Sequence, residues 1–419
     1  MTRAGDYTDY DIVIAGGGMI GSTLALALAP LRLRVAIVEP VARAAEQQPS
    51  FDERSTAMSR STQRMYEAMG LWEAIVAAST PITRIHVSDK GRLGLSHIDA
   101  DEQGVEALGY VVINRVLGQV LQAALDEAEA LAFHCPARIV AAAPGDDSVI
   151  ATIEDGDGTA SEIRCRLLIA ADGANSAVRG MLGIGAKQAS YAQSAIVGNL
   201  LPEKSLENCA YERFTENGPL ALLPLSEGRA GFVWTLCEHD VERVLELADQ
   251  AFLDELQGAF GFRLGKFTRV GRRSAYPLMV SKALRLTAPR AVLVGNAANG
   301  LHPVAAQGFN LGLRDVAALC DCIADAAATA REHGVECDVG DSQLLERYAT
   351  WRRRDQQKLV AFTDGLVRLF GHSSRPVRML RNIGMLGFDL VPGVRSLFAK
   401  HTMGLAGRLP RLSRGVPLQ

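Results

Sequence analysis

Short apolar runs and helical apolar spacing alternate at the start of the chain. Residues 12–14 are wholly apolar, as buried parallel strands are, and residues 34–39 (RVAIVE) form a second strand-like run. Between them, apolar residues recur at the helical spacing of positions 20, 24, 28 and 31. The order strand, helix, strand predicts the first unit of a Rossmann-like parallel sheet.

A glycine-rich turn joins the first strand to the helix. Gly16, Gly18 and Gly21 give the pattern G-x-G-x-x-G, which allows a tight turn, close approach of a pyrophosphate, and close packing of helix on strand. The free N–H groups of the helix N-terminus attract phosphate. Glu39 lies 18 residues after the last glycine, where an acid can bind both ribose hydroxyls. This combination predicts a dinucleotide site with an unphosphorylated ribose, and therefore NAD or FAD rather than NADP.

Two later segments repeat the pattern of a buried strand followed by small and polar residues. Residues 164–184 contain a strand that runs into Asp172, and residues 291–296 form a strand that runs into a glycine-rich stretch. That stretch ends where a helix is expected to begin, near residues 308–310. A flat, anionic ligand would explain small residues and a helix N-terminus at one place.

The remaining pattern predicts the domain organisation. Residues 76–100 and 186–275 alternate as an antiparallel sheet does, and residues 341–365 show a helical pattern. We therefore expect an α/β protein with a discontinuous Rossmann-like domain, an inserted, mainly antiparallel β substrate domain, and a helical C-terminal region. Their expected bounds are 1–75, 101–185 and 276–340 for the first, 76–100 and 186–275 for the second, and 341–419 for the third.

The composition is that of a globular protein. The 419 residues are 48% hydrophobic and 22% charged, which suits two or three domains. A net charge of −3 excludes a general nucleic-acid-binding protein, because such proteins need a basic surface. The seven cysteines lack metal-type spacing, so we expect reduced thiols and no metal site. Neither a signal-peptide pattern nor an apolar stretch of about 18 residues occurs, so we expect a cytoplasmic protein.

The C-terminal part of the chain is basic and apolar. From residue 368 onward, nine basic residues stand against Asp389 alone, which gives a net charge of +8. Such a segment suits an anionic membrane surface or an acidic partner, and it equally suits helix packing with solvated arginines. Both interpretations stay open on the sequence.

The motifs together resemble a known family. The glycine turn, the Asp-Gly pair at residue 172 and the later Gly-Asn pair followed by H-P-x-x-x-Q-G are similar to those of the group A flavoprotein aromatic hydroxylases, which share the para-hydroxybenzoate hydroxylase fold. The similarity is closest to their ubiquinone-biosynthesis branch, over segments that begin at residues 51 (FDERSTAMSRSTQRMYEAMGLW), 108 (LGYVVINRVLGQVL), 212 (ERFTENGPLALLPL) and 296 (NAANGLHPVAAQGFNLGLRDVAAL). Asn296 stands where most of the group has Asp, which resembles the 2-polyprenyl-6-methoxyphenol hydroxylase subgroup.

The resemblance implies FAD as the cofactor and places residues around it. Arg54 and Arg115 match basic positions near the phosphates or the flavin, and Asp172 lies near the pyrophosphate unless it merely begins a turn. The helix start at residues 308–310 would stabilise negative charge on the flavin by about 0.3–2 kcal/mol. The expected cofactor-binding residues are Gly16, Gly18, Gly21, Glu39, Arg54, Arg115, Asp172, Gly295, Asn296, Gly308, Phe309 and Asn310.

The loop before that helix departs from the family at one position. It carries His302, Pro303, Gln307 and Gly308 at the flavin, and Ala306 replaces the usual glycine. If that position needs a positive φ, alanine costs on the order of 1 kcal/mol. His302 is either a general acid–base or a residue that shapes the loop, and we favour the second because a substrate phenol directs the attack itself. No residue is therefore assigned as a certain catalytic group.

The implied function is hydroxylation of a polyprenylated methoxyphenol in ubiquinone biosynthesis, with NAD(P)H and O2 as co-substrates and a flavin C4a-hydroperoxide as intermediate. Expected partners are the prenylated phenol and, through the basic segment, a membrane surface or other ubiquinone-biosynthesis proteins.

Two alternatives stay open. One is a hydroxylase of a soluble aromatic acid, for which Arg213 is the candidate carboxylate partner; the other is a non-catalytic flavin-binding or lipid-docking subunit of a biosynthetic assembly. A flavin halogenase is disfavoured because W-x-W-x-I-P is absent. Five residues of the expected substrate domain suit either an aromatic pocket or a core: Phe214, Leu222, Leu223, Pro224 and Trp234.

Overall fold

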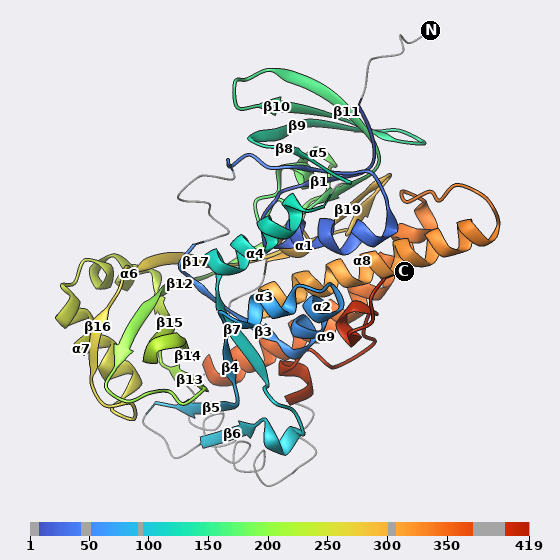
Figure 1. Cartoon of the computed structure of the whole chain (residues 1–419). Coiled ribbons are helices and arrows are strands. Elements are labelled where there is room, and N and C mark those ends of the chain that lie inside the picture. Colours follow the sequence, from blue (N-terminus) through green and yellow to red (C-terminus); the bar gives the residue numbers. More distant parts are fainter. Residues whose placement is uncertain are drawn as a thin grey trace.

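The computed structural model describes residues 8–42, 52–90, 95–128, 130–300, 307–371 and 399–418. Two large sheets and a small one carry the fold, and helices cover them (Figure 1). The expected α/β class is confirmed. Single turns of 3-10 helix occur at Ala29–Leu31, Asp101–Gln103, Ser226–Gly228, Gly295–Ala297 and Leu412–Arg414.

The first sheet is built on parallel strands. Its order is β18-β19-β11-β1-β2-β8, and β1 pairs in parallel with β11 and β2. The apolar run at residues 12–14 lies inside β1, as the sequence predicted. The strands are β1 (Thr8–Ala15), β2 (Val35–Val38), β8 (Leu131–His134), β9 (Ala137–Pro144), β10 (Val149–Asp155), β11 (Ala160–Ala170), β18 (Thr287–Ala288) and β19 (Ala291–Leu293).

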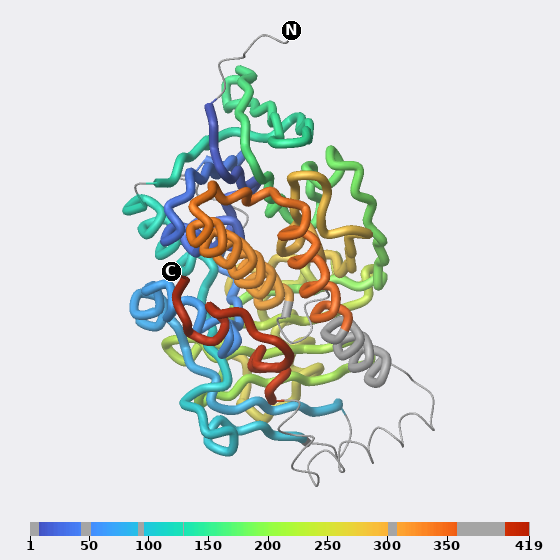
Figure 2. The backbone as a smooth tube through the Cα atoms, turned by 90° about the vertical axis from the view of Figure 1, so that its right-hand side faces the viewer, coloured from blue at the N-terminus to red at the C-terminus, as the bar shows by residue number. Residues whose placement is uncertain are grey.

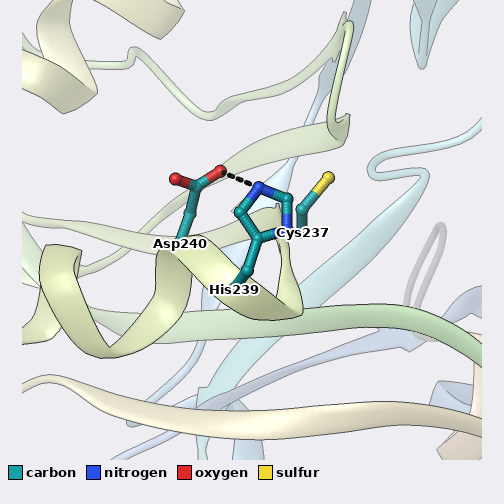
Figure 3. Close-up of side chains that lie close together, drawn as sticks. All are labelled: Cys237, His239 and Asp240. Carbon is teal, nitrogen blue, oxygen red and sulfur yellow. Dashed lines mark ion pairs between the residues drawn. The ribbon is translucent and has the colours of Figure 1, made fainter.

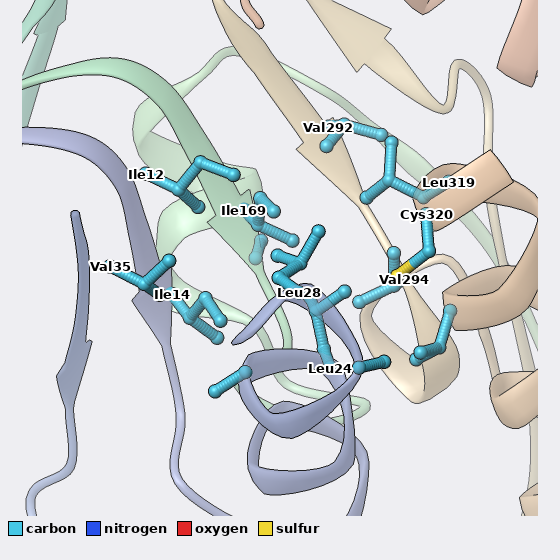
Figure 4. Close-up of a cluster of buried hydrophobic side chains, with 14 of the residues drawn as sticks. Ile12, Ile14, Leu24, Leu28, Val35, Ile169, Val292, Val294, Leu319 and Cys320 are labelled. Atoms are coloured by element: carbon cyan, nitrogen blue, oxygen red, sulfur yellow. The ribbon is translucent and has the colours of Figure 1, made fainter. Parts of the chain in front are cut away.

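The main core lies between this sheet and the helices on its face. Helix α1 (Met19–Leu28) follows β1, and α8 (Gln307–Glu332) packs against α1. Their apolar side chains interlock with those of β1, β11 and β19 in Figure 4, and these core residues are almost completely buried. The residues drawn there include Ile12, Ile14, Leu24, Leu28, Val35, Ile169, Val292, Val294, Leu319 and Cys320. Burial of this apolar surface explains why the local strand–helix–strand pattern could be read from sequence.

The second sheet is mainly antiparallel. Its order is β20-β17-β12-β15-β14-β13-β5-β6, with β16 paired to β12; only β13 and β5 run parallel among its described pairs. The strands are β5 (Arg84–Asp89), β6 (Leu95–Asp99), β12 (Ala186–Pro202), β13 (Cys209–Thr215), β14 (Gly218–Pro224), β15 (Ala230–Cys237), β16 (Phe267–Val270), β17 (Ser274–Ala283) and β20 (Asn299–Gly300). The expected domain boundary at residues 275 and 276 falls inside β17, and the division into domains stays a prediction.

One face of the second sheet is covered by two helices. Helices α6 (Glu238–Leu245) and α7 (Asp249–Phe260) lie on the side away from α8 in Figure 1. Phe232 and Trp234 of β15 contact Phe252 of α7, with ring centroids 5.7 and 5.8 Å apart. Trp234 and Leu222 therefore belong to this core, which settles the choice between core and pocket for these two residues.

A small sheet lies beside α8 and also contacts the second large sheet. Strand β7 (Gly109–Ile113) lies between β3 (Ser55–Ser59) and β4 (Thr80–Ile82). Strand β3 and helix α2 both contact α8. The helices are α2 (Arg60–Ala68), α3 (Trp72–Val76), α4 (Asn114–Asp126) and α5 (Ala177–Met181).

The C-terminal part packs back onto the molecule. Helix α9 (Ser342–Gly371) lies beside α8, and residues 399–418 run along these helices in Figure 2. Leu412 is buried in the main core, and Met403 is buried against residues of β6. Within the described residues, none of the helices is long and apolar enough to span a membrane. All seven cysteines are free thiols, four of them buried.

Candidate functional site

The turn after β1 has no room for side chains. Gly16 adopts a φ of +99°, and a Cβ on it would lie 2.7 Å from the carbonyl oxygen of Ala171. A Cβ on Gly21 would lie 1.9 Å from the carbonyl oxygen of Gly16. Gly18 is the N-cap of α1 and supplies no side chain to cap it. The first N–H groups of α1 are therefore left for an anionic ligand.

Glu39 follows β2 and faces this turn. Its carboxylate accepts hydrogen bonds from the backbone N–H of Gly17 at 2.6 Å and of Val41 at 2.9 Å. These bonds hold a largely buried negative charge at the end of the strand beside β1. This is the position at which the sequence predicted an acceptor for ribose hydroxyls.

Asp172 follows β11, on the other side of β1. Its Oδ2 accepts from the N–H of Val178 at 3.1 Å, whereas its Oδ1 is buried and has no hydrogen-bond partner in the described part of the chain. A buried carboxylate oxygen without a partner is costly, so this atom suits a ligand that donates a hydrogen bond.

Arg179 connects the Asp172 loop to the loop after β19. Its buried guanidinium donates to the carbonyl oxygens of Ala174 at 3.0 Å and Ala297 at 2.9 Å. Sequence reasoning missed this role, because a lone arginine after a strand gives no signal of which distant carbonyls it binds.

The loop after β19 presents Asn296. Gly295 has a φ of +60°, and a Cβ on it would lie 3.2 Å from Ile20 of α1. Asn296 is the one exposed residue in the run 291–300, all of which is described. Its side chain therefore points away from the interior, next to α1.

Four predicted positions thus meet at one edge. Strands β2, β1, β11 and β19 are successive parallel neighbours, and Glu39, Gly16, Asp172 and Asn296 follow their carboxyl ends. Ligands of open α/β sheets bind at this edge. We name these four loops the carboxyl edge.

Helix α8 begins next to the carboxyl edge. It starts at Gln307, and a Cβ on Gly308 would meet no atom of the described residues within 4 Å. Phe309 is half-buried against the main core. The side chain of Asn310 is committed to protein: it accepts from the N–H of Ser59 at 2.9 Å and donates to the carbonyl of Ala57 at 2.9 Å. Its side chain is therefore engaged within the protein.

Parts of the predicted loop lie outside the described residues. These are His302, Pro303 and Ala306, together with the side chain of Gln307.

The two predicted arginines lie on paired segments, since the N–H of Arg115 donates to the carbonyl of Asp52 at 2.9 Å, but their side chains have different partners. Arg54 binds Asp52 at 2.5 Å, and its guanidinium carbon lies 4.5 Å from the centre of the Tyr276 ring on β17. Arg115 forms an exposed ion pair with Glu53 at 2.6 Å. The structure thus places Arg54 against β17 of the second sheet, whereas the side chain of Arg115 lies on the surface.

The second sheet turns a half-exposed, mainly apolar face toward the rest of the molecule. Neighbouring strands bring together four residues of this face, which we call the substrate wall: Val197, Glu212, Ala221 and Val233. Residues next to them on the same strands, such as Leu220 and Phe232, are buried against α7. Since side chains alternate along a strand, the substrate wall is the face opposite α7.

Arg213 lies on the wrong side for a partner of a substrate carboxylate. It neighbours Glu212 on β13 and so points to the α7 face, where its guanidinium approaches the Cβ position of Gly261 at 3.8 Å. Burial lowers the pKa of Arg213, and nearby Arg263 lowers it further.

A buried ion-pair network supports the carboxyl edge from behind. The N–H of Gly295 donates to Asp315 of α8 at 3.0 Å, and Arg352 of α9 binds that carboxylate at 2.6 Å. Burial raises the pKa of Asp315, and Arg352 opposes the rise. Arg314 of α8 binds Asp355 at 2.8 Å and the carbonyl of Ala406 at 3.0 Å. The carboxyl edge is therefore tied to both α9 and residues 399–418.

Three possible metal ligands lie at the start of α6 (Figure 3): Cys237, His239 and Asp240. His239 is 81% exposed and lies 3.4 Å from Asp240, which also pairs with Arg243 at 3.8 Å. The three residues are close mainly because they are sequence neighbours, and they lie at the end of β15 and the start of α6 rather than in the four loops of the carboxyl edge.

Comparisons with known proteins agree with this geometry. The FAD binding domain family matches residues 9–363 of the chain. Ubiquinone hydroxylase UbiL of Rhodospirillum rubrum is 39% identical over 412 residues, which cover 97% of this chain and 93% of that protein. The 3-demethoxyubiquinol 3-hydroxylase of Escherichia coli is 32% identical over 401 residues, which cover 94% and 98%.

Among solved structures, p-nitrophenol 4-monooxygenase PnpA of Pseudomonas putida matches with a TM-score of 0.78 at 18% identity. The match covers 96% of this chain and 99% of that one. At this identity the likeness shows the fold.

Proposed function

The chain belongs to the FAD binding domain family and is an FAD-dependent monooxygenase, and on that premise we propose that it hydroxylates a polyprenylated methoxyphenol in ubiquinone biosynthesis. The single observation that carries the proposal is the convergence of four loops at the carboxyl edge, where the loop after β19 joins the second sheet through the pairing of β20 with β17. NAD(P)H and O2 are the co-substrates.

The carboxyl edge fits FAD. We propose that the glycine turn holds the pyrophosphate, that Glu39 accepts from the ribose hydroxyls, and that Asp172 uses its unpartnered Oδ1 toward the cofactor. Asn296 would bind the ribityl region, since an amide accepts a hydroxyl as a carboxylate does. When bound, FAD supplies the redox chemistry, namely electrons from NAD(P)H and the activation of O2.

The protein's remaining tasks are orientation and exclusion of water. The N-terminus of α8 would place backbone N–H groups of Gly308 and Phe309 at the flavin. The apolar part of the substrate wall would bind the aromatic ring and keep water away from it. Arg54 would lie between cofactor and substrate. The ion pair of Arg115 with Glu53 argues against direct binding of the cofactor by Arg115.

The substrate wall favours a phenol over an aromatic acid. Its strands β14, β15 and β12 bring only uncharged residues to the wall, and its acidic residue Glu212 would repel a carboxylate. The candidate partner for an acid, Arg213, lies on the opposite face. The names of the ubiquinone hydroxylases among the relatives support the same choice.

Anaerobic reduction tests the proposal. NADPH is added to the FAD-loaded protein with and without a short-chain 2-prenyl-6-methoxyphenol, and O2 is then admitted. We expect the flavin absorption to bleach faster with the phenol and a hydroxylated product to form. Bound flavin that NADPH cannot reduce would support the non-catalytic alternative, and a protein that binds no FAD would overturn the proposal.

We also propose that the basic segment docks on an anionic membrane, where a polyprenylated substrate resides. Within residues 399–418, two of the four basic residues are used in packing instead: Arg411 pairs with Asp321 at 3.2 Å, and Arg408 stacks on Trp351 at 4.5 Å. Docking therefore rests on the basic residues between 368 and 395, whose side chains lie outside the described part.

Replacement of three of those arginines tests docking, namely Arg375, Arg378 and Arg381, each changed to Gln. At about 1 kcal/mol for each charge, binding to phosphatidylglycerol vesicles should fall by roughly a hundredfold. Changing the exposed Arg353 and Arg354 of α9 to Gln gives the control. Equal binding by both variants would contradict membrane docking through this segment.

A further inference from the structure

Glu212 is the acidic group of the substrate wall. It lies on β13 between Val87 of β5 and Ala221 of β14, and Val233 and Val197 continue the same row across the sheet. A carboxyl group in the middle of an apolar sheet face is unfavourable unless it has a partner or a function.

The face of the sheet that carries this row is turned toward the segment that leads from the Glu39 loop into β3. A Cβ on Gly231 would lie 2.5 Å from the hydroxyl of Ser55 on β3. Tyr276 contacts Arg54, and its hydroxyl donates to Asp52 at 3.5 Å. Both contacts are with residues 52–55, so Glu212 lies on the same face of the second sheet as the residues that meet this segment.

The carboxyl group of Glu212 is largely surrounded by protein. The residue is only partly exposed, and desolvation raises its pKa to about 7. Within the described part of the chain its carboxylate makes no hydrogen bond and no ion pair. A partly buried carboxylate without a donor suits a ligand that brings one.

We propose, on the basis of the function proposed above, that the Glu212 carboxylate binds the phenol hydroxyl of the substrate and takes its proton as the ring is hydroxylated. The O–H bond of the phenol breaks, a new O–H bond forms on the carboxylate, and the electron pair stays on the phenol oxygen. The added electron density enters the aromatic ring, which is the electron-rich partner in the oxygenation. Proton transfer changes no oxidation state and needs no further reactant.

Few other titratable groups face Glu212. Among the described residues on this face, β5 brings Asp89, β15 brings Cys237 at its far end, and β17 brings Tyr276 with Arg54 and Asp52 behind it. Strands β14 and β12 bring uncharged residues to the row. The carboxylate form must be present to take the proton, so hydroxylation should rise with pH through the pKa of Glu212.

The experiment compares Glu212→Gln with the wild-type holoenzyme. Glutamine keeps the shape and can still accept a hydrogen bond, but it cannot take a proton at neutral pH. We expect FAD content and the rate of flavin reduction by NADPH without the phenol to stay unchanged. The hydroxylation rate in a single turnover should fall by about a hundredfold, the lower end of general-base effects, and its rise with pH near 7 should disappear. A ring-halogenated phenol, which ionises more readily, should restore part of the rate.

Glu216→Gln is the matched control, because Glu216 is exposed in the turn after the same strand. It should hydroxylate at the wild-type rate and keep the pH profile. If Glu212→Gln hydroxylates as Glu216→Gln does at every pH, this inference is wrong while the proposed function stands. If the wild-type protein itself hydroxylates no prenylated phenol, the proposed function and with it this inference are both wrong.

Discussion

Removing the charge of Arg352 tests how strongly the carboxyl edge depends on α9. The Arg352 guanidinium lies 2.6 Å from the Asp315 carboxylate, and both side chains are 1% exposed. Loss of one partner of such a pair leaves an uncompensated buried charge, which costs about 3–5 kcal/mol. With about 2.1 cal/mol/K of unfolding entropy per residue, the 419 residues convert that cost into a fall of roughly 3–6 °C in the melting temperature of Arg352→Met.

The size of this loss should depend on pH. Burial raises the pKa of Asp315, and Arg352 opposes that rise. Without the arginine, the pKa of Asp315 in the folded protein lies further above its value in the unfolded chain. The stability contributed by the neutral acid is then present at low pH and is lost as the pH rises through the folded pKa. The variant should therefore lose less stability at about pH 5 than at about pH 8.

Thermal melts of the FAD-loaded proteins at both pH values provide the assay. Arg353→Met is the control, because Arg353 is exposed on the same helix and surface changes usually stay within about 0.5 kcal/mol. A double variant with Asp315→Asn removes both charges and should recover part of the loss. If Arg352→Met and Arg353→Met have the same melting temperature, the reasoning is refuted.

Three further outcomes follow from the geometry. Gly21→Ala puts a methyl group 1.9 Å from a backbone oxygen of the same turn, so the purified protein should lack FAD absorption, whereas Gly180→Ala, which meets no atom within 4 Å, should keep it. Asp172→Ala removes the carboxylate with the unpartnered oxygen, so FAD affinity by equilibrium dialysis should fall by about tenfold or more, with little change in the melting temperature of the apoprotein; unchanged affinity would exclude a direct contact. Burial, with nearby arginines, lowers the pKa of His86 from 6.5 to about 4. The stability that the neutral imidazole contributes is therefore present above pH 6.5 and is lost as the pH falls toward 4. Urea titrations of His86→Leu should show a smaller loss of unfolding free energy over this pH range than the wild-type protein, and an equal loss would contradict this account.

The sequence predicted those parts of the site that are local in the chain. The glycine turn, Glu39 and the start of α8 near residue 308 follow from motif and spacing, because strand, turn and helix are formed by neighbouring residues. That neighbouring parallel strands carry Asp172 and Asn296 to the same edge also follows from the general rule for such sheets.

Other features depend on register and packing between distant segments. Whether Glu212 or Arg213 faces the substrate is decided by the pairing of β13 with β5 and β14, and a shift by one residue would exchange the two faces. The side chain of Asn310 binds Ser59 at the β3–α2 junction, which lies 251 residues earlier in the chain. No local pattern contains that information. The Asp315–Arg352 pair is similarly fixed by how α9 packs on α8.

The ties behind the carboxyl edge also set the order in which the protein can acquire its cofactor during synthesis. Gly16 leaves the ribosome early, but Arg179 needs the carbonyl of Ala297, and Arg314 needs that of Ala406. Contacts between residues about a hundred positions apart form late in folding, because a long loop must close before they can stabilise the folded state. The glycine turn is therefore synthesised well before the residues that complete its surroundings. We expect flavin to bind only after these segments are made, so polypeptides that end before Ala297 should not retain FAD.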